Sequence, residues 1–361
     1  MKNMPYAVIL AGGRGERFWP LSTSRTPKQV LSLLGKKPMI QIAAERIRGV
    51  VPDKNIMIIT GKENVKQMRE CAKFLPAKNV IGEPFGRDTA AACALAWALV
   101  RARNKNAVMC VLTADHIIGK IPIFRKTLSD AFKMCRDSGK LVTIGIKPRF
   151  PSTGFGYIRA GKKIPLKTKT VFRSALKFVE KPGKATAEKY MKSGRYFWNS
   201  GMFVWTVQSF ENELRKHAPE LWKSAVKLSS CRTSEKLTRS LRLEYGKLKR
   251  ISIDYALLEK SDNIAVAEGK FAWDDVGTWQ ALENHFKRDA KGNVLIGKTS
   301  VLDSEDNVVF SRERLTALIG VKDVVVVQAP GATLVCGKDM VQKVKDMVKK
   351  LSARSDCSDL I

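Results

Sequence analysis

The stretch that decides the fold is "YAVILAGGRGERFWPLSTSRTPKQ", residues 6–29. A short apolar run opens it, and a run of this length followed by glycine predicts a buried strand. The loop behind it holds three glycines, four cationic side chains and two prolines. Glycines allow the backbone to turn tightly and to direct its N–H groups at an anion, and the cations add full charges. The sequence therefore predicts a first strand that ends in a phosphate-binding loop.

Strand and helix patterns alternate from this loop to about residue 150. The expected strands are residues 55–61, 79–84, 107–116 and 141–146, and the expected helices are residues 38–50, 63–75, 88–103 and 123–138. Such alternation indicates βαβ units, a parallel sheet and helices on both faces. Ligands of these folds bind beyond the carboxyl ends of the strands. We therefore expect "AGGRG" and "TADH", which each end a strand, to lie at one rim.

Length and pattern predict two domains. A chain of 361 residues exceeds one ordinary domain. After residue 150 the pattern changes to turns and short strands, becomes helical over 210–259, and returns to short strands after 288, before an amphipathic helix at 339–351. We predict a catalytic domain over 1–288 and a small β-rich domain over 289–361. We see no clear internal repeat, and we expect the last ten residues to fray.

Charge and composition narrow the function classes. Lys plus Arg number 65 against 34 Asp plus Glu, so the formal charge is +31, which favours anionic partners. The excess is spread along the chain, without the aromatic and basic interleaving of RNA-binding motifs, so we do not expect a nucleic-acid partner. No apolar run is long enough to span a membrane, and no secretory signal is visible. Seven scattered cysteines and three distant histidines predict reduced thiols in a cytoplasmic protein without a zinc site.

The loop fits neither common phosphate motif. It lacks the Gly-Lys-Ser/Thr ending of a Walker A loop and the third glycine of the dinucleotide fingerprint. Its spelling instead resembles the signature of sugar-nucleotide pyrophosphorylases (nucleotidylyltransferases), and especially of their mannose-1-phosphate guanylyltransferase branch. The resemblance continues through "EPFGRDTAAA", "LTADHII", "TGFGYI", "FVEKP", "WNSGMF", "SIDYALLEK" and "WDDVGTW". The chain departs from the family pattern at Glu16, where Thr is usual, at Asp88, where Asn is usual, and at Ala92, where Pro is frequent.

The resemblance implies a fold and a reaction. The fold is an α/β, Rossmann-like (glycosyltransferase-A-like) mixed sheet flanked by helices, with a small β-rich C-terminal domain. The reaction joins GTP and mannose 1-phosphate, gives GDP-mannose and pyrophosphate, and uses Mg²⁺. Because the attacking phosphate oxygen is already an anion, no general base is needed, and we expect His116 to be structural. Two polyanions must meet, so catalysis depends on positioning and on neutralisation of charge.

The same resemblance assigns residues to roles. Arg17 and Lys28 are expected at the triphosphate, with Asp115 and Asp275 as ligands of Mg²⁺. Asp274 is the second choice of ligand, and a strand-end Asp such as Asp115 has helix capping as its alternative role. The residues expected at the nucleotide are Gly12, Gly13, Gly15, Arg87, Asp88 and Thr89. The residues expected at the sugar phosphate are Gly156, Glu180, Lys181 and Asn199. The tryptophans beside these motifs are expected to pack in the core.

Several alternatives remain open at this point. Guanine presents two adjacent donors that one carboxylate accepts, so Asp88 or Glu83 could read the base, as could backbone carbonyls; Asp88 could instead cap a helix. The substrates could be another hexose 1-phosphate or another nucleotide, or the chain could bind a sugar nucleotide without turnover. About 70 residues follow residue 288, too few for the isomerase domain of bifunctional relatives, so no isomerase activity is expected. The C-terminal strands are expected to pack on the catalytic domain or to form a homodimer contact.

Overall fold

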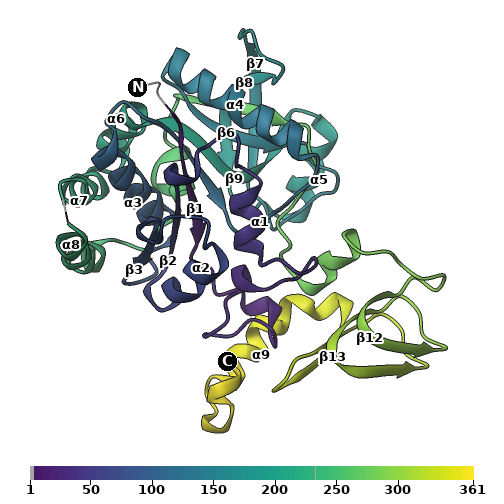
Figure 1. The fold of residues 1–361 in the computed structure, drawn as a ribbon. Coiled ribbons are helices and arrows are strands. Elements are labelled where there is room, and N and C mark those ends of the chain that lie inside the picture. The colour runs from purple at the N-terminus through teal and green to yellow at the C-terminus, as the bar shows by residue number, and fades with distance from the viewer. Residues whose placement is uncertain (1–3, 232) are drawn as a thin grey trace. The chain divides into compact units, whose positions relative to one another are not determined.

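The computed structural model describes residues 4–231 and 233–361, which form two compact units (Figure 1). Unit 1 contains the residues up to Gly12 together with Ala43–Ala114 and Ile118–Trp273. Unit 2 contains Gly13–Ile42, Asp115–Ile117 and Asp274–Ile361. The glycine-rich loop after β1 therefore belongs to the same unit as the C-terminal strands, whereas two consecutive domains were expected from the sequence.

Unit 1 is built on a mixed nine-stranded sheet, as predicted, with the strand order β3-β2-β1-β4-β9-β6-β10-β8-β7. Its strands are β1 (Tyr6–Ala11), β2 (Ile56–Gly61), β3 (Val80–Glu83), β4 (Val108–Thr113), β6 (Leu141–Ile146), β7 (Tyr157–Ile164), β8 (Phe172–Val179), β9 (Tyr196–Thr206) and β10 (Ile264–Gly269). Strands β1 to β4 are parallel, so their carboxyl ends share one rim. Leu10 pairs with Thr113, so the strands that precede "AGGRG" and "TADH" are direct neighbours and end at the same rim, and the shared rim was expected.

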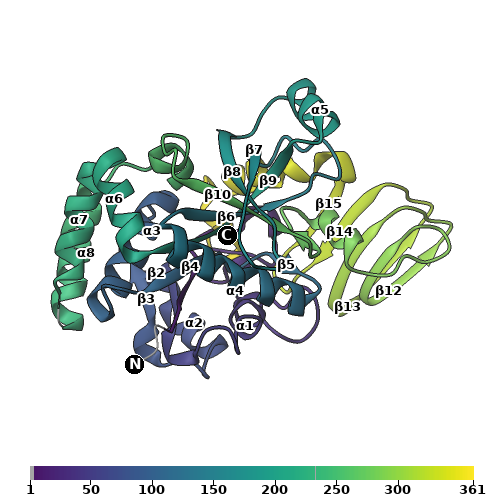
Figure 2. The ribbon, with the colours of Figure 1, turned by 90° about the horizontal axis from the view of Figure 1, so that it is seen from above.

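Helices cover both faces of this sheet. Unit 1 contains α2 (Val65–Cys71), α3 (Asp88–Arg103), α4 (Ile121–Ser138), α5 (Lys184–Ser193), α6 (Val207–His217), α7 (Pro219–Ser229) and α8 (Ser234–Lys247). Figures 1 and 2 show α3 on one side of the central strands and α4 on the other. Six alanines in the first eleven residues of α3 allow close packing, and the helix is buried on most of its surface. Trp97 of α3 anchors α6, because its indole Nε1 donates a hydrogen bond of 2.8 Å to the carbonyl of Val207.

The shorter elements complete the chain. Helix α1 (Met39–Glu45) and the two-residue strands β5 (Ile117–Ile118) and β11 (Trp273–Asp274) each include a boundary between the units. Single 3₁₀ turns occupy Glu16–Phe18, Lys28–Val30, Asp53–Asn55, Lys62–Asn64, Ala77–Asn79, Trp279–Asn284, Lys338–Lys343 and Ser355–Leu360, and a π turn occupies Asp254–Leu258.

Unit 2 contains a four-stranded sheet and one α-helix. Its elements are β12 (Val294–Leu302), β13 (Val308–Ile319), β14 (Val324–Gln328), β15 (Thr333–Gly337) and α9 (Val344–Leu351). Strands β12, β13 and β14 pair in parallel, with Val294 opposite Val308 and Val308 opposite Val325. The beginnings of these three strands therefore lie side by side in the sheet.

An asparagine ladder joins these parallel strands. Asn293 and Asn307 stand directly before β12 and β13 and are fully buried. The Asn293 side-chain oxygen accepts hydrogen bonds of 3.0 Å from both the backbone N–H and the side-chain amide of Asn307. The Asn307 oxygen accepts in turn from the backbone N–H of Val324. The sequence does contain a sign of this ladder, because "GNVLI" is followed by the similar "DNVVF". The two segments are only five residues long, so the similarity is easy to overlook.

The phosphate-binding loop packs into the core of unit 2. Phe18 lies 4.9 Å from the ring of Trp279, which lies 5.4 Å from Phe310 of β13. Trp19 donates a 2.8 Å hydrogen bond to the carbonyl of Leu360, and Cys357 is buried. The last residues are therefore held in place, which corrects the expectation that they fray.

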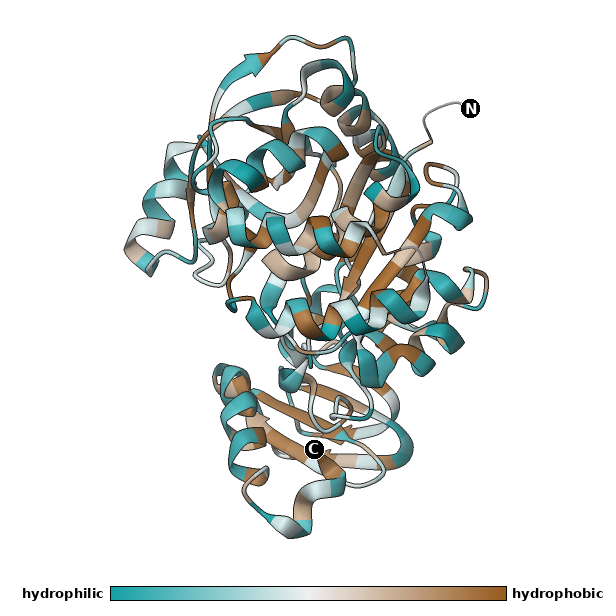
Figure 3. Ribbon diagram, turned by 90° about the vertical axis from the view of Figure 1, so that its left-hand side faces the viewer, coloured by the Kyte–Doolittle hydropathy of each residue, from teal (hydrophilic) through white to brown (hydrophobic). Residues whose placement is uncertain are grey.

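The distribution of hydrophobic residues and the state of the cysteines can be compared with the expectations from composition. Hydrophobic residues concentrate along the strands, and the helices carry one polar side (Figure 3). Within the described residues, no helix has the length and apolar content needed to cross a lipid bilayer. All seven cysteines lie in the described part of the chain and none forms a disulfide.

Candidate active site

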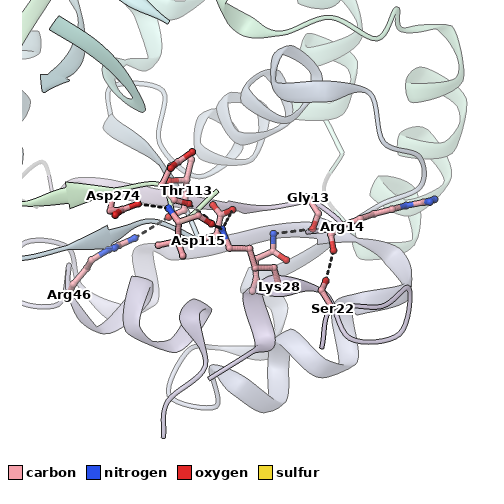
Figure 4. Close-up of polar contacts among 11 residues, drawn as sticks. Gly13, Arg14, Ser22, Lys28, Arg46, Thr113, Asp115 and Asp274 are labelled. Atoms are coloured by element: carbon pink, nitrogen blue, oxygen red, sulfur yellow. Dashed lines mark hydrogen bonds and ion pairs between the residues drawn. The ribbon is translucent and has the colours of Figure 1, made fainter. Parts of the chain in front are cut away.

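The loop after β1 is shaped by glycine and fixed by side chains of unit 2. Gly15 has a φ of +69°, and a Cβ there would lie 2.4 Å from the Cβ of Lys28, so no other residue fits. Ser22 donates to the Arg14 carbonyl at 2.7 Å, and the Gln29 amide donates to the Gly13 carbonyl at 3.0 Å (Figure 4). The backbone between Gly13 and Gly15 is therefore held in a defined shape.

Arg17 and Lys28, both expected at the triphosphate, have opposite surroundings. Arg17 is exposed, and its guanidinium makes no hydrogen bond or ion pair with the residues that the structure describes. Lys28 is buried, with 4% of its surface exposed. Among the residues that the structure describes, Arg17 is thus a cation without a partner, whereas Lys28 is part of a fixed polar cluster.

Three acceptors surround the Lys28 ammonium. Its Nζ donates to Asp115 Oδ2 at 3.1 Å, to the Asp275 carbonyl at 3.1 Å and to the Val276 carbonyl at 2.7 Å. Figure 4 shows the lysine extended toward Asp115. Burial alone raises the pKa of Asp115, but the Lys28 ammonium, together with His116, lowers it below the ordinary value. Lys28 and the two predicted metal ligands are therefore brought together within unit 2, although they are far apart in sequence.

The turn that carries Asp275 is strained and is held by its neighbour. Val276 is fully buried and has a φ of +46°, a left-handed value that is a true outlier for a β-branched residue. Asp274 Oδ1 accepts from the Val276 N–H at 2.8 Å, and Asp274 Oδ2 lies 3.0 Å from both the His285 Nε2 and the amide of Asn284. The Asp274 carboxylate already has three hydrogen-bonding partners, and it stabilises the turn at Val276. Of the two neighbouring aspartates, Asp275 is therefore the better candidate to bind a ligand.

The Asp115 and Asp275 carboxylates suit a divalent cation. Burial raises the pKa of Asp275 to about 6; the charges of Asp274 and Asp115 act in the same direction, and Lys28 opposes them. A cation would relieve this repulsion, and Mg²⁺ is usually held by one or two carboxylates together with phosphate oxygens of a substrate. Within the described residues no group of three or more His, Cys, Asp or Glu side chains is arranged for a metal.

A second group of predicted residues lies at the rim of unit 1, where β1 and β3 end. Glu83 closes β3 and is 7% exposed, and its Oε2 lies 3.4 Å from where a Cβ on Gly12 would stand. Burial raises the pKa of Glu83 to about 7, while a hydrogen bond from Tyr245 opposes the shift. A buried carboxylate beside the glycine loop is an acceptor that a nucleotide base could reach.

The neighbouring residues expected at the nucleotide have structural partners. Arg87 donates to the carbonyls of Tyr245 and Gly246 at 2.9 and 3.2 Å. Asp88 has a φ of +67° and accepts from the N–H of Thr89 at 2.7 Å; it is the first residue of α3, which has no side-chain cap hydrogen bond, so its alternative role as a cap is not observed. The Thr89 hydroxyl accepts from the N–H of Ile253. Among these side chains, Glu83 is the buried acceptor, and the others fasten the loop.

The residues expected at the sugar phosphate come together in unit 1. The Asn199 N–H donates to the Gly156 carbonyl at 2.8 Å, and a Cβ on Gly156 would lie 2.6 Å from Glu180 Oε2, so a larger residue there would displace the glutamate carboxylate. Lys181 Nζ lies 3.2 Å from Glu180 Oε1. The Asn199 amide donates to Asp254 Oδ1 at 2.7 Å. Four predicted residues thus form one polar cluster with Asp254.

Asp254 joins this polar cluster, although the sequence reasoning gave it no role. Burial raises its pKa to about 6, and the charge of Glu180 contributes. It lies in the "SIDYALLEK" motif, which was noted as part of the resemblance but given no role. Tyr245 and His285 were missed as well, because only the fold brings them to Glu83 and Asp274. The tryptophans beside the sugar cluster are buried as expected, with Trp198 and Trp273 each packed against Phe155.

Two family models and several curated proteins match this chain. The family described as Nucleotidyl transferase matches residues 6–292, and the family described as MannoseP isomerase/GMP-like beta-helix domain matches residues 297–351. A mannose-1-phosphate guanylyltransferase of Salmonella typhimurium is 39% identical over 350 residues, which are 95% of this chain and 72% of the relative. One of Escherichia coli K12 is 36% identical over 96% of this chain and 73% of its own length.

A solved structure resembles this chain over almost its whole length. A protein of Thermus thermophilus, described as a mannose-1-phosphate geranyltransferase, superposes with a TM-score of 0.86 and 32% identity, covering 97% of this chain and 99% of that one. The parallel strands of unit 2, with their asparagine ladder, fit the description of the second family. On its sequence, its fold and these relatives, the chain belongs to the mannose-1-phosphate guanylyltransferase family of nucleotidyl transferases.

Proposed function

We propose that this protein transfers the guanylyl group of GTP to mannose 1-phosphate and releases pyrophosphate. A phosphate oxygen of mannose 1-phosphate forms a bond to the α-phosphorus of GTP. The bond from that phosphorus to the oxygen that bridges it to the β-phosphorus breaks, and pyrophosphate leaves with the electron pair. The nucleophile is already ionised, so no side chain has to accept a proton. The observation that carries the proposal is the cluster of the buried Lys28 with the half-buried Asp115 and Asp275, in a chain with 36–39% identical guanylyltransferase relatives.

The chain's own cations reduce the repulsion between the two anionic substrates. Arg17 is exposed and unpaired within the described residues, so it is free to contact the triphosphate. Lys28 is a fixed charge, and its three acceptors hold it beside Asp115 and Asp275. Fixed charges that need no rearrangement during reaction are the main source of catalysis in phosphoryl transfer, and loss of one such contact typically costs about 100-fold in rate.

We propose Mg²⁺ as the cation held by Asp115 and Asp275. When bound, it supplies charge neutralisation for the phosphates. Asp275 is suited to this because burial and the neighbouring charges of Asp274 and Asp115 penalise its charge when no cation is present, while the Lys28 ammonium keeps Asp115 ionised. Asp274 contributes by holding the left-handed turn at Val276, which keeps the Asp275 carbonyl on Lys28.

We propose Glu83 as the residue that reads guanine. The N1–H and N2–H₂ groups of guanine are adjacent donors, and an ionised carboxylate accepts both. Glu83 is favoured over Asp88 because it is buried at the end of β3, while Asp88 is exposed and accepts from the N–H of Thr89. A buried acceptor strongly discriminates against a base that lacks the matching donors, because its oxygen then stays unpaired.

We propose the cluster around Asn199 as the binding site for mannose 1-phosphate. Glu180 and Asp254 offer carboxylate oxygens to neighbouring hydroxyls, and Gly156 allows close approach. Lys181, whose ammonium pairs with Glu180 at 3.2 Å, supplies positive charge for the phosphate. The seven free thiols support a reducing compartment, and we place the enzyme in the cytoplasm.

The test is release of pyrophosphate with Mg²⁺ over a grid of four nucleoside triphosphates and several hexose 1-phosphates. We expect turnover with GTP and mannose 1-phosphate, and its loss in Asp275→Asn. The matched control is Asp262→Asn, an exposed aspartate in unit 1. Preference for another pair overturns the substrate assignment, and absence of turnover with every pair in folded protein overturns the reaction.

A further inference from the structure

Tyr245 joins the end of α8 to the nucleotide side of unit 1 at two points. Its side chain is fully buried, and its hydroxyl lies 3.0 Å from Glu83 Oε1 and 3.2 Å from the Ala91 carbonyl. Its own carbonyl accepts a 2.9 Å hydrogen bond from Arg87. The phenol is therefore aimed at Glu83 from a residue whose backbone is itself fastened to the loop after β3.

The Tyr245 hydroxyl restricts rotation about the terminal torsion of the Glu83 side chain. The terminal torsion of a glutamate is broad and roughly two-fold, so a buried carboxylate needs a specific partner to fix its plane. A phenol carries one proton, and an ionised Glu83 is a stronger acceptor than the neutral Ala91 carbonyl. Donation to Oε1 fixes the carboxylate and leaves Oε2 on the side of Gly12.

We infer that Tyr245 is a positioning residue that sets the base preference of the enzyme through the Glu83 carboxylate. The inference rests on the proposed function, in which Glu83 accepts from guanine. Two coplanar oxygens are needed to accept from N1–H and N2–H₂ together, and a carboxylate that rotates meets only one donor well. Loss of the tyrosine hydroxyl therefore affects guanine more than a base that presents N1–H alone.

Hypoxanthine is that base, because it lacks the exocyclic amine, so GTP and ITP form the test pair. We expect Tyr245→Phe to raise the KM for GTP about tenfold, to leave kcat within about twofold, and to lower the GTP-over-ITP preference in kcat/KM about tenfold. Tyr6→Phe is the matched control, since Tyr6 begins β1 at the opposite end from Gly12, and it should leave the preference unchanged.

The decisive arm repeats the substitution in a Glu83→Gln background. If Tyr245 acts through Glu83, the effect of Tyr245→Phe on the GTP-over-ITP ratio disappears there. An equal effect in both backgrounds, or an equal change in GTP and ITP kinetics, shows a merely structural tyrosine and overturns the inference.

Failure of the underlying proposal gives a different result. If wild-type protein turns over GTP and ITP equally well, Glu83 does not read the amine, and both ideas fall. If the wild type prefers GTP and Glu83→Gln removes that preference while Tyr245→Phe does not, only the role of Tyr245 is overturned. The ratio is measured on folded enzyme within each variant, so a variant of lower stability still gives a valid result.

Discussion

Replacing Lys28 by methionine removes an ammonium that three acceptors share while keeping the length of the side chain. The substitution leaves the Asp115 carboxylate without its cation and leaves the carbonyls of Asp275 and Val276 without a donor. Breaking a buried ion pair costs about 3–5 kcal/mol when one partner is removed. The Asp115 side chain is 32% exposed, so water offsets part of that cost, and we expect a loss near the lower limit, about 3 kcal/mol.

The assay is hydrogen exchange of the peptides that cover residues 13–42 and 274–285, which reports on unit 2 directly. We expect faster exchange in Lys28→Met, with Val276 most affected because its left-handed turn loses a 2.7 Å contact. The matched control is Lys36→Met, the same change at an exposed position of unit 2. Equal exchange in the two variants would refute the reasoning, since the three contacts would then contribute nothing to stability.

Three further predictions follow from other parts of the molecule. Arg17→Ala should leave thermal stability unchanged, because the side chain has no partner within the described residues, yet should lower the rate of pyrophosphate release about 100-fold; a normal rate contradicts its assignment. Asn293→Ala should destabilise the chain by about 3 kcal/mol in thermal unfolding, because it leaves the buried amide and backbone N–H of Asn307 without their acceptor, and a change below about 1 kcal/mol contradicts the ladder. Glu83 has a pKa of about 7 when folded against an ordinary 4.5, so the folded chain binds the extra proton and stability falls by about 3 kcal/mol as pH rises from 4.5 to 7. Glu83→Gln should flatten that slope in unfolding curves, and an unchanged slope assigns it to other groups.

The sequence was sufficient where function depends on local pattern. The apolar run before the glycines, the alternation up to residue 150 and the motif spellings predicted the sheet and the residues of the sugar cluster. Asn199 and Glu180 lie in separate motifs. Glu180 directly follows β8 and Asn199 lies within β9, and both strands belong to one sheet, so the fold brings the two side chains close together. The glycine at position 15 also agrees with the structure, because a Cβ there would collide with Lys28.

The sequence alone could not choose between neighbouring candidate residues when the choice depends on a contact with a residue far away in the chain. The choice between Asp274 and Asp275 depends on His285 and Asn284, which occupy the first carboxylate. The choice between Glu83 and Asp88 depends on burial and on Tyr245, which is 162 residues from Glu83. Unit 2 draws its core from both ends of the chain, as the packing of Phe18 against Trp279 shows, and no local pattern reports such a pairing.

The central claim is that a phosphate oxygen of mannose 1-phosphate attacks the α-phosphorus of GTP directly. Isotope labelling tests this most directly, with ¹⁸O in the non-bridging phosphate oxygens of mannose 1-phosphate and unlabelled GTP as the co-substrate. The account predicts that GDP-mannose, measured by ³¹P NMR, retains all of the label and that pyrophosphate contains none. Label in pyrophosphate, or an unlabelled oxygen between the two phosphorus atoms of GDP-mannose, would contradict it.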